Sequence, residues 1–496
     1  METTPLESSS TPSESSSTPS ESSTTPSTTV PKKKKQGLGW IEWIRGWMYI
    51  IYEMLFQRIM ASHLQNPLSL PPINNLTCIV TGSTSGIGLQ IARQLAESGA
   101  HVVMAVRNTK AAHDLIHKWQ SEWTGLGLPL NIEVMELDLL SLESVSRFAE
   151  AWNARMGPLH VLINNAGIFS IRGYRGFPSI TGNWYSLVTD TKSCLLYKWP
   201  VSCKWRSHDQ TVEGSAEMKV RITQRKGNKG EVAFFSQGHG YWWTGSIALP
   251  NVKSTDEHLR PQKFSKDGHE EHMQVNHLAP ALLSILLLPS LIRGSPSRII
   301  NVNSVTYAIT SEKRKLFNMT MHYVGFVDTE DMNVVSGKRK YTSLVGYTGS
   351  KLAQVMFSSV LHRRLPAESG ISVLCVSPGV VQTNVARDLP KIVQAGYHLI
   401  PYFIFNAQEG SRSALFSATD PQIPEYCELL KSDDWPVCAF ISQDCRPTNP
   451  SEEAHNIDTA YKVWEKTLEM IGLPSDAIEK LIEGEEVRCR YGERQE

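Results

Sequence analysis

Tyr347 and Lys351 are the two residues of this sequence with the clearest chemical use. They stand four positions apart along an expected helix, and residues at that spacing share one helix face. A free tyrosine has a pKa near ~10, too high for efficient proton transfer at neutral pH. A nearby lysine charge favours the tyrosinate and lowers that pKa. The spacing therefore predicts Tyr347 as a general acid or base, and the alternative for the pair alone is a solvated pair on a helix surface.

A glycine-rich turn, Thr81–Gly88, predicts a phosphate-binding site. It follows the apolar run 76–80, typical of a buried strand, and leads into residues 89–96, whose apolar spacing is helical. Glycines let the backbone approach a ligand closely, and a helix N-terminus offers unpaired amides and a partial positive charge. The alternative is a turn with no ligand. The candidate cofactor residues here are Gly82, Ser83, Ser85, Gly86, Ile87 and Gly88.

A second expected strand, residues 101–106, ends in Arg107 and Asn108. In dinucleotide-binding folds a carboxylate at this strand end binds the ribose 2′-hydroxyl, whereas an arginine suits a 2′-phosphate. Arg107 therefore favours NADP(H) over NAD(H). The alternative is an arginine that only faces solvent.

Further strands are expected over 132–137, which ends at Asp138, over 159–163, which ends in Asn164–Gly167, and over 371–376. Helical patterns over 111–123 and 142–155 separate the first of these strands. Strands that alternate with helices predict an α/β fold with a doubly wound parallel sheet, Rossmann-like, in a single domain over residues 72–496.

These motifs occur together and in the order found in the short-chain dehydrogenase/reductase family, and the sequence resembles its retinol-dehydrogenase-like branch. The motifs that carry the resemblance are the glycine turn, Asp138, Asn164–Gly167, Asn276 within Gln274–Leu278, Ser304 after Ile299–Asn303, Tyr347–Lys351, and Ser377–Gly379 with Thr383.

The resemblance implies the roles of these residues in hydride transfer between a nicotinamide cofactor and a carbonyl or alcohol. The implied catalytic residues are Asn276, Ser304, Tyr347 and Lys351. Ser304 would hydrogen-bond the substrate oxygen, Asn276 would carry a proton relay to water, and Lys351 would also hold the nicotinamide ribose. The implied cofactor residues beyond the glycine turn are Arg107, Asn108, Asp138, Asn165, Ala166, Gly167, Tyr347, Lys351, Pro378, Gly379 and Thr383.

The N-terminal region is expected to divide into three parts. Residues 1–37 form a disordered Ser/Thr/Pro tail that ends in a lysine cluster, and residues 61–71 form a linker. Between them, residues 38–60 combine a tryptophan-rich apolar face with a polar stripe, a pattern that favours a helix lying on a membrane surface. The alternatives are a helix that spans the membrane and one that packs on the catalytic domain or on a partner.

Two stretches depart from the family pattern, at about 172–260 and 306–320. The first shows no periodicity beyond a few residues, and such a long structureless loop is unusual within a compact domain. The resemblance resumes on each side, which favours the hypothesis that both are translated introns, from alternative splicing or an error in the gene structure. The alternative for the first is a genuine inserted recognition module.

The amino-acid composition bears on nucleic-acid partners, metal sites and the cellular compartment. The 496 residues contain 49 basic and 49 acidic side chains, which argues against a nucleic-acid partner. The eight cysteines have no close C-x-x-C spacing, so no metal site is expected, and the thiols indicate a reducing, cytosolic-type compartment.

The expected function is NADP(H)-dependent interconversion of a lipophilic carbonyl and alcohol at a membrane. The apolar segment 389–405, which by analogy forms the substrate lid, favours a lipophilic substrate. The apolar helix 279–291 packs either on the sheet or at a homodimer interface. The alternative function is a catalytically silent NADP(H)-binding scaffold or regulatory protein.

Overall fold

The computed structural model describes residues 56–123, 130–169, 262–304, 326–339, 341–382, 404–431 and 437–492, and the backbone of four strands between residues 200 and 248. Several expectations fall outside these residues: the tail 1–37, most of the helix 38–60, Thr383, the stretch 306–320, and most of the segment 389–405.

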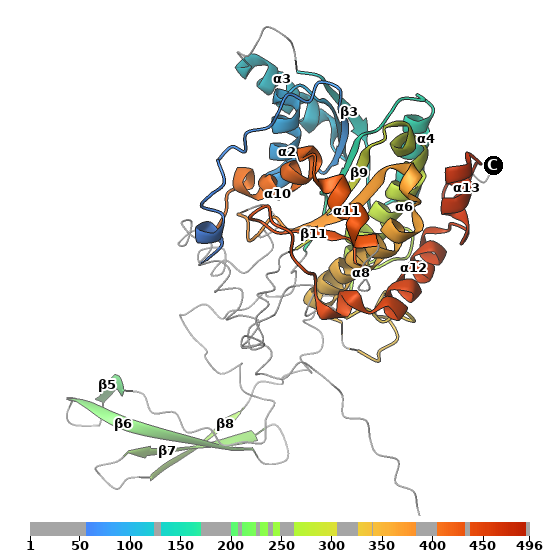
Figure 1. Ribbon diagram of the computed structural model, residues 1–496. Coiled ribbons are helices and arrows are strands. Elements are labelled where there is room, and N and C mark those ends of the chain that lie inside the picture. The colour runs from blue at the N-terminus through green and yellow to red at the C-terminus, as the bar shows by residue number, and fades with distance from the viewer. Residues whose placement is uncertain are drawn as a thin grey trace, which may run out of the picture. The chain divides into compact units, whose positions relative to one another are not determined.

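A seven-stranded sheet forms the centre of the fold, with the strand order β11-β10-β9-β4-β1-β2-β3 (Figure 1). Every neighbouring pair in it is parallel. The strands are β1 (Thr77–Thr81), β2 (His101–Val106), β3 (Ile132–Glu136), β4 (Val161–Asn164), β9 (Ser297–Val302), β10 (Ile371–Val376) and β11 (Ala439–Ile441). The order reverses between β1 and β4, where doubly wound sheets bind their ligands at the carboxyl ends of the strands.

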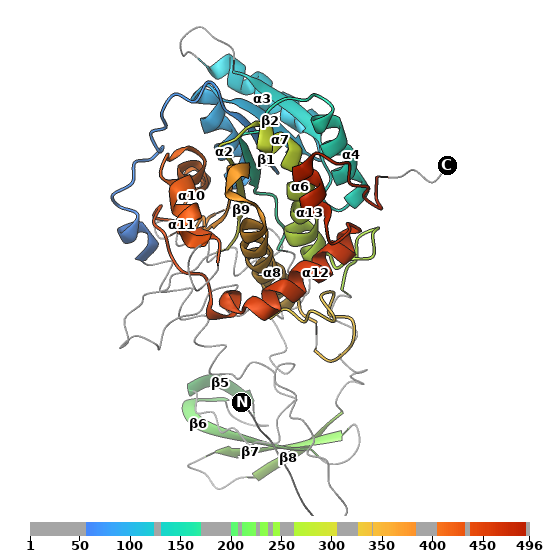
Figure 2. The same cartoon turned by 45° about the vertical axis from the view of Figure 1, so that its right-hand side comes forward.

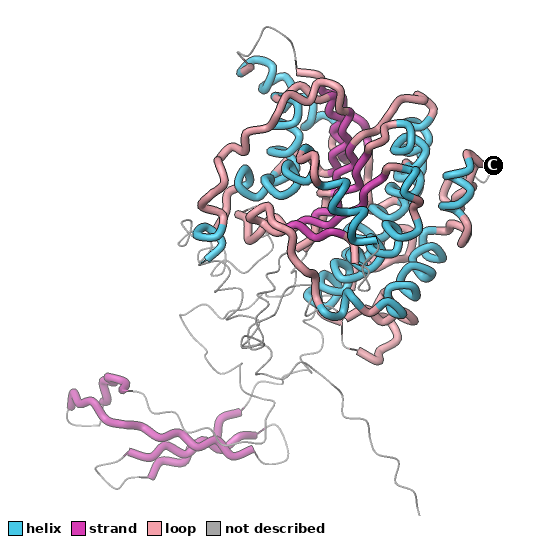
Figure 3. The backbone as a smooth tube through the Cα atoms, viewed as in Figure 1, coloured by secondary structure: helices cyan, strands magenta, loops and turns pink. Residues whose placement is uncertain are grey.

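Helices cover both faces of this sheet (Figures 2 and 3). One apolar cluster joins the sheet to α2 (Gly86–Glu97), α3 (Thr109–Glu122), α10 (Ala407–Thr419) and α11 (Ile423–Lys431). The other joins it to α4 (Leu142–Asn153), α6 (Ala279–Leu286), α7 (Leu288–Arg293), α8 (Ser343–Arg364), α12 (Ile457–Ile471) and α13 (Ala477–Glu483). Side chains of a strand alternate between the clusters, as Cys78 and Ile79 of β1 do. The expected α/β fold is confirmed.

The apolar helix expected over 279–291 is longer and less regular than its pattern indicated. Helical structure begins at α5 (Glu271–Met273) and passes through a π-helical turn, Gln274–Leu278, before α6. A break at Leu287 separates α6 from α7, whose second residue is Pro289. Every residue of α6 is buried within this chain, so packing on the sheet accounts for its apolar composition.

The stretch 172–260 shows no sustained periodicity in its sequence, yet the structure describes four strands within it. β5 (Pro200–Arg206), β6 (Thr211–Gln224), β7 (Lys229–Ser236) and β8 (Trp242–Ala248) pair as an antiparallel sheet of their own.

Within the described residues no helix is long and apolar enough to cross a bilayer. Of the expected membrane-associating segment, residues 56–60 are described and are helical.

Candidate active site

The glycine turn has the backbone conformation that its sequence requires. Gly82 and Gly86 have φ values of +66° and +58°, in the left-handed region that favours glycine. A Cβ at position 82 would lie 2.9 Å from the Cβ of Ala166. A Cβ at position 88 would collide with the side-chain amide of Asn165 and lie 2.6 Å from the carbonyl oxygen of Gly82. The turn therefore closes tightly against the residues that follow β4.

The start of α2 offers donors for an anion. Ser85 is the N-cap residue, yet its side chain caps no helix amide, and the first turn carries no acidic residue. Ser83 is fully buried, and its hydroxyl has no partner within the described part of the chain. Unpaired amides at a helix N-terminus and a buried hydroxyl suit a phosphate group. This geometry fits the phosphates of a dinucleotide.

Thr81 joins the ends of β1 and β4. Its Oγ1 accepts hydrogen bonds from the backbone amides of Asn165 and Ala166, both at 3.0 Å. In return, the side-chain amide of Asn165 donates to the Thr81 carbonyl oxygen at 3.0 Å. The four-residue segment Asn164–Gly167 is therefore held beside the glycine turn, where the sequence placed it.

Arg107, Asn108 and Asp138, the residues expected near the adenosine end of the cofactor, differ in their contacts. Arg107 is exposed and forms no ion pair or hydrogen bond with the described residues. The Asn108 side chain caps α3, because its oxygen accepts from the Ala111 amide at 3.1 Å. One carboxylate oxygen of Asp138 accepts from the Leu140 amide at 3.0 Å. Of these three side chains, Arg107 alone forms no hydrogen bond or ion pair with the described residues.

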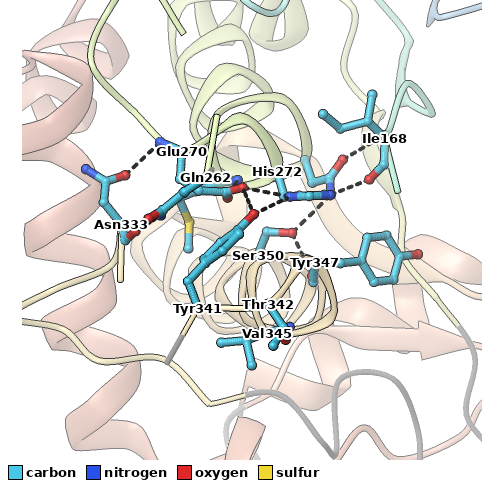
Figure 4. Close-up of polar contacts among 12 residues, drawn as sticks. Ile168, Gln262, Glu270, His272, Asn333, Tyr341, Thr342, Val345, Tyr347 and Ser350 are labelled. Atoms are coloured by element: carbon cyan, nitrogen blue, oxygen red, sulfur yellow. Dashed lines mark hydrogen bonds and ion pairs between the residues drawn. The ribbon is translucent and has the colours of Figure 1, made fainter. Parts of the chain in front are cut away.

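Asn276 lies in the π-helical turn and is completely buried. Its side-chain oxygen accepts from the Ile168 amide at 2.8 Å, and its nitrogen donates to the Ile168 carbonyl at 3.1 Å and to the Ser350 hydroxyl at 3.0 Å. The Ser350 hydroxyl donates to the Tyr347 carbonyl oxygen at 2.7 Å. One amide side chain thus joins the segment that follows β4 to the turn of α8 that carries Tyr347 and Lys351. Figure 4 shows Ile168, Ser350 and Tyr347 of this connection.

Lys351 is the buried charge of the site. Its Nζ donates to the Val302 carbonyl at the end of β9, at 2.8 Å. Burial lowers the pKa of Lys351 to about 8, and a smaller effect of Cys375 opposes the shift. A Cβ at Gly167 would lie 3.2 Å from the Asn276 oxygen and 3.8 Å from the Lys351 Nζ. The absence of a side chain at Gly167 therefore leaves space next to both groups.

The Tyr347 ring packs against Phe169, with ring centroids 4.5 Å apart. Ser304 follows β9, and its amide donates to the Asn303 side chain at 2.8 Å. Pro378 and Gly379 follow β10, and Gly379 has a φ of +77°. The structure thus brings Asn276, Lys351 and Gly167 together, and Ser350 links Asn276 to the backbone of Tyr347. Ser304 and Gly379 lie just after the carboxyl ends of two neighbouring strands.

Comparison with known proteins agrees with this geometry. The sequence model of the family described as "short chain dehydrogenase" matches residues 76–183 and 331–393. The dehydrogenase/reductase SDR family member FEY of Arabidopsis thaliana is 58% identical over 94% of this chain and 97% of its own length. The chain belongs to the short-chain dehydrogenase family. Human retinol dehydrogenase 11 and human polyprenol dehydrogenase are 25% and 24% identical, each over 86% of this chain and 93% of its own length.

This short-chain dehydrogenase also has a buried polar cluster that sequence reasoning missed: Glu270, His272 and Tyr341 (Figure 4). One carboxylate oxygen of Glu270 contacts both the His272 Nδ1 and the Tyr341 hydroxyl at 2.7 Å. The His272 ring meets the Tyr347 ring edge-on, with centroids 6.4 Å apart. His272 precedes Asn276 by four positions in a helical segment, and this spacing was the signal available in the sequence.

The Glu270 carboxylate is held in its charged form. Burial raises its pKa, but the hydrogen bonds and charge of His272, with the hydrogen bonds of Tyr341 and the Met273 amide, outweigh burial and lower it. Burial and the Glu270 charge raise the pKa of the Tyr341 phenol. Tyr341 therefore stays protonated and donates to Glu270. Through His272, this hydrogen-bonded cluster packs against the Tyr347 ring.

Proposed function

We propose that this chain is an NADP(H)-dependent oxidoreductase that interconverts a lipophilic carbonyl and alcohol, with Tyr347 as the acid or base. The observation that carries the proposal is the convergence of Lys351 and Asn276 on Gly167, at the end of β4 and beside the glycine turn. The family is one of nicotinamide-dependent oxidoreductases. The preference for NADP(H), the substrate class and the role of Tyr347 are the parts that we propose.

In the reduction direction, Tyr347 donates a proton to the carbonyl oxygen of the substrate. Lys351, one helical turn away and mostly charged at pH 7, favours the tyrosinate that remains. Ser304 hydrogen-bonds the same oxygen, and Asn276 holds the α8 turn in register with the end of β4. The hydride comes from the nicotinamide of NADPH when the cofactor is bound in the glycine turn.

The NADP(H) preference rests on Arg107, whose guanidinium is available at the end of β2. Arg107→Ala removes one charge-assisted contact to the 2′-phosphate, so kcat/KM for NADPH is expected to fall by about 10- to 100-fold. The value for NADH should stay within about twofold, because NADH has no 2′-phosphate to lose. Steady-state kinetics with both cofactors measures this ratio.

Arg155→Ala is the matched control for that variant. Arg155 forms a two-contact ion pair with Glu133, at 2.8 and 2.7 Å, and has no place at the glycine turn. Its NADPH/NADH ratio should equal that of the unsubstituted chain. An Arg107→Ala variant that lost activity equally with both cofactors would contradict the proposed 2′-phosphate contact.

A lipophilic substrate and a membrane location are proposed together. The support is the tryptophan-rich, amphipathic composition of residues 38–60 and the apolar composition of residues 389–405. The membrane surface is then the partner of residues 38–60, with the catalytic domain in a reducing, cytosolic-type compartment. A homodimer is part of the same proposal.

The second candidate is a catalytically silent NADP(H)-binding scaffold or regulatory protein. One observation favours it: the family match omits residues 184–330, a range that includes both Asn276 and Ser304. The glycine turn and Arg107 lie inside the match, so cofactor binding is expected of either candidate. Turnover therefore distinguishes the two.

We also propose that the stretches at about 172–260 and 306–320 are retained introns that lower activity in this chain. The second begins directly after Ser304, and a small misplacement of such a residue can lower the rate by about 10²-fold. A chain that lacks both stretches should therefore turn over a panel of lipid carbonyls with NADPH about 10²-fold faster. Equal turnover by both chains would contradict this proposal, and no turnover by either would favour the scaffold.

A further inference from the structure

Residues 56–60 carry two side chains that contact the cofactor-side loop of the domain more than 320 positions away. Gln57 is buried, with 1% of its surface exposed. Its side-chain oxygen accepts from the Val380 amide at 2.9 Å, and its nitrogen donates to the Val380 carbonyl at 3.0 Å. A single glutamine side chain thus pairs with both backbone groups of Val380, as a neighbouring strand would.

Val380 directly follows Gly379, in the loop after β10. A Cβ at Gly379 would lie 2.9 Å from the Gln57 side-chain oxygen and 3.2 Å from the Phe405 ring. The positive φ of Gly379 and its missing side chain therefore make room for Gln57. Gln57 thus sets the path of the chain immediately after Pro378 and Gly379.

Arg58 holds the segment that precedes α10. Its guanidinium donates to both carboxylate oxygens of Glu409, at 2.8 and 3.1 Å, and to the Ile404 carbonyl at 3.0 Å. Glu409 also closes the capping box of α10 with Asn406. Two-contact arginine–carboxylate pairs fix geometry as well as charge. Arg58 therefore positions the first turn of α10.

The two anchored segments are joined to each other and to the glycine turn. Val381 and Phe405 form a parallel bridge, with the Phe405 amide donating to the Val380 carbonyl at 3.0 Å and the Gln382 amide to the Phe405 carbonyl at 2.8 Å. In α10, a Cβ at Gly410 would meet Val381 at 2.6 Å and Ile87 at 3.4 Å. The contacts of residues 56–60 thus extend through one continuous unit to Ile87 in the glycine turn.

We propose that Gln57 and Arg58 are positioning residues for the cofactor site, so that the end of the N-terminal segment belongs to the catalytic unit and is not a detachable anchor. This inference rests on the proposed function for its cofactor. Without the two side chains, the loop after Gly379 and the start of α10 lose the contacts that fix them against Ile87. Cofactor affinity then falls, although neither side chain belongs to the glycine turn.

The test uses the full chain with Gln57→Ala and Arg58→Ala separately, and two measurements. Hydrogen exchange at the Val380 amide should rise at least about tenfold in Gln57→Ala, because that amide loses its acceptor. The dissociation constant of NADPH should rise about tenfold in each variant, the equivalent of one net hydrogen bond to a charged group or a buried backbone group. Arg58→Lys should recover part of the affinity, since it keeps the charge and loses the two-contact geometry.

Arg155→Ala is the control, since it breaks a similar two-contact pair elsewhere in the domain. It should change neither measurement. Unchanged exchange at Val380, or unchanged NADPH affinity in both alanine variants, would overturn the inference. A loss of affinity in Arg155→Ala as large as in Arg58→Ala would do the same. If the unsubstituted chain binds no NADPH, the proposed function fails, while exchange at Val380 still decides whether Gln57 holds the loop.

Discussion

Replacing Tyr347 by phenylalanine is expected to lower kcat for carbonyl reduction by about 10²- to 10⁴-fold, the usual contribution of a general acid, with NADPH affinity within about twofold of the original. Phenylalanine keeps the ring that packs on Phe169 at 4.5 Å and meets His272 edge-on, and so removes the hydroxyl with little change in packing. Single-turnover kinetics with NADPH and a substrate found by panel screening measures the chemical step directly.

Tyr341→Phe is the matched control for this variant. Tyr341 lies six positions earlier in the chain, and its hydroxyl donates to Glu270 at 2.7 Å, so its removal takes one hydrogen bond from the buried cluster. We expect a cost in stability of about 1 kcal/mol and a loss of rate below about tenfold. Equal rate losses in the two variants would contradict the assignment of Tyr347 as the acid.

Lys351→Met is expected to abolish most activity while leaving the protein at least as stable at pH 7. Burial lowers the pKa of Lys351 from 10.5 to about 8. Keeping this side chain charged in the folded state therefore costs about 3 kcal/mol below pH 8. Methionine avoids that cost, and it leaves the Val302 carbonyl without its donor, a loss of about 1–3 kcal/mol. The avoided cost of the buried charge and the lost hydrogen bond to Val302 are similar in size, so stability is kept. Methionine supplies no charge beside Tyr347, so activity is lost.

The lowered pKa of Lys351 also predicts how the free energy of unfolding changes with pH. The unfolded chain holds the Lys351 proton up to about pH 10.5 and the folded chain up to about 8, so the folded form gains stability as pH rises between these values. Buried thiols act in the opposite sense, because burial raises the pKa of Cys78, Cys427 and Cys445 to about 12. The difference in unfolding free energy between the unsubstituted chain and Lys351→Met cancels the thiols and should rise from pH 8 to 10. A flat difference would contradict the shifted pKa.

The long parallel strands could be predicted because each is an apolar run followed by polar or glycine residues at the sheet edge. The range 101–106 matches β2 at both ends. β11 was missed, because its three residues, Ala439–Ile441, are too few to show a pattern and it forms by pairing with β10. Helical periodicity around Asn276 did not indicate the π-helical turn, in which the Asn276 side chain accepts from the Ile168 amide, 108 positions away.

The sequence also could not reveal contacts made across long separations. Gln57 stood in the polar stripe of a helix expected on a membrane, with Arg58 next to it, yet their partners are Val380 and Glu409. These contacts agree with the alternative for this segment, a helix that packs on the catalytic domain, over residues 56–60. The structure also gives Asn108, expected at the cofactor from its position after β2, a local contact as the N-cap of α3.

The pairing of β4 with β9 has a consequence for how the chain acquires its fold during synthesis. Asn164 and Asn301 are hydrogen-bonded neighbours in the sheet and stand 137 residues apart. The half-sheet of β1 to β4 can assemble while β9 is still unmade, since domains form from the N-terminus as the ribosome releases them. Until β9 arrives, β4 is an unpaired apolar edge, the kind of surface on which chains aggregate. Any stretch of chain between the two strands, including residues 172–260, lengthens the time during synthesis for which that edge stays exposed.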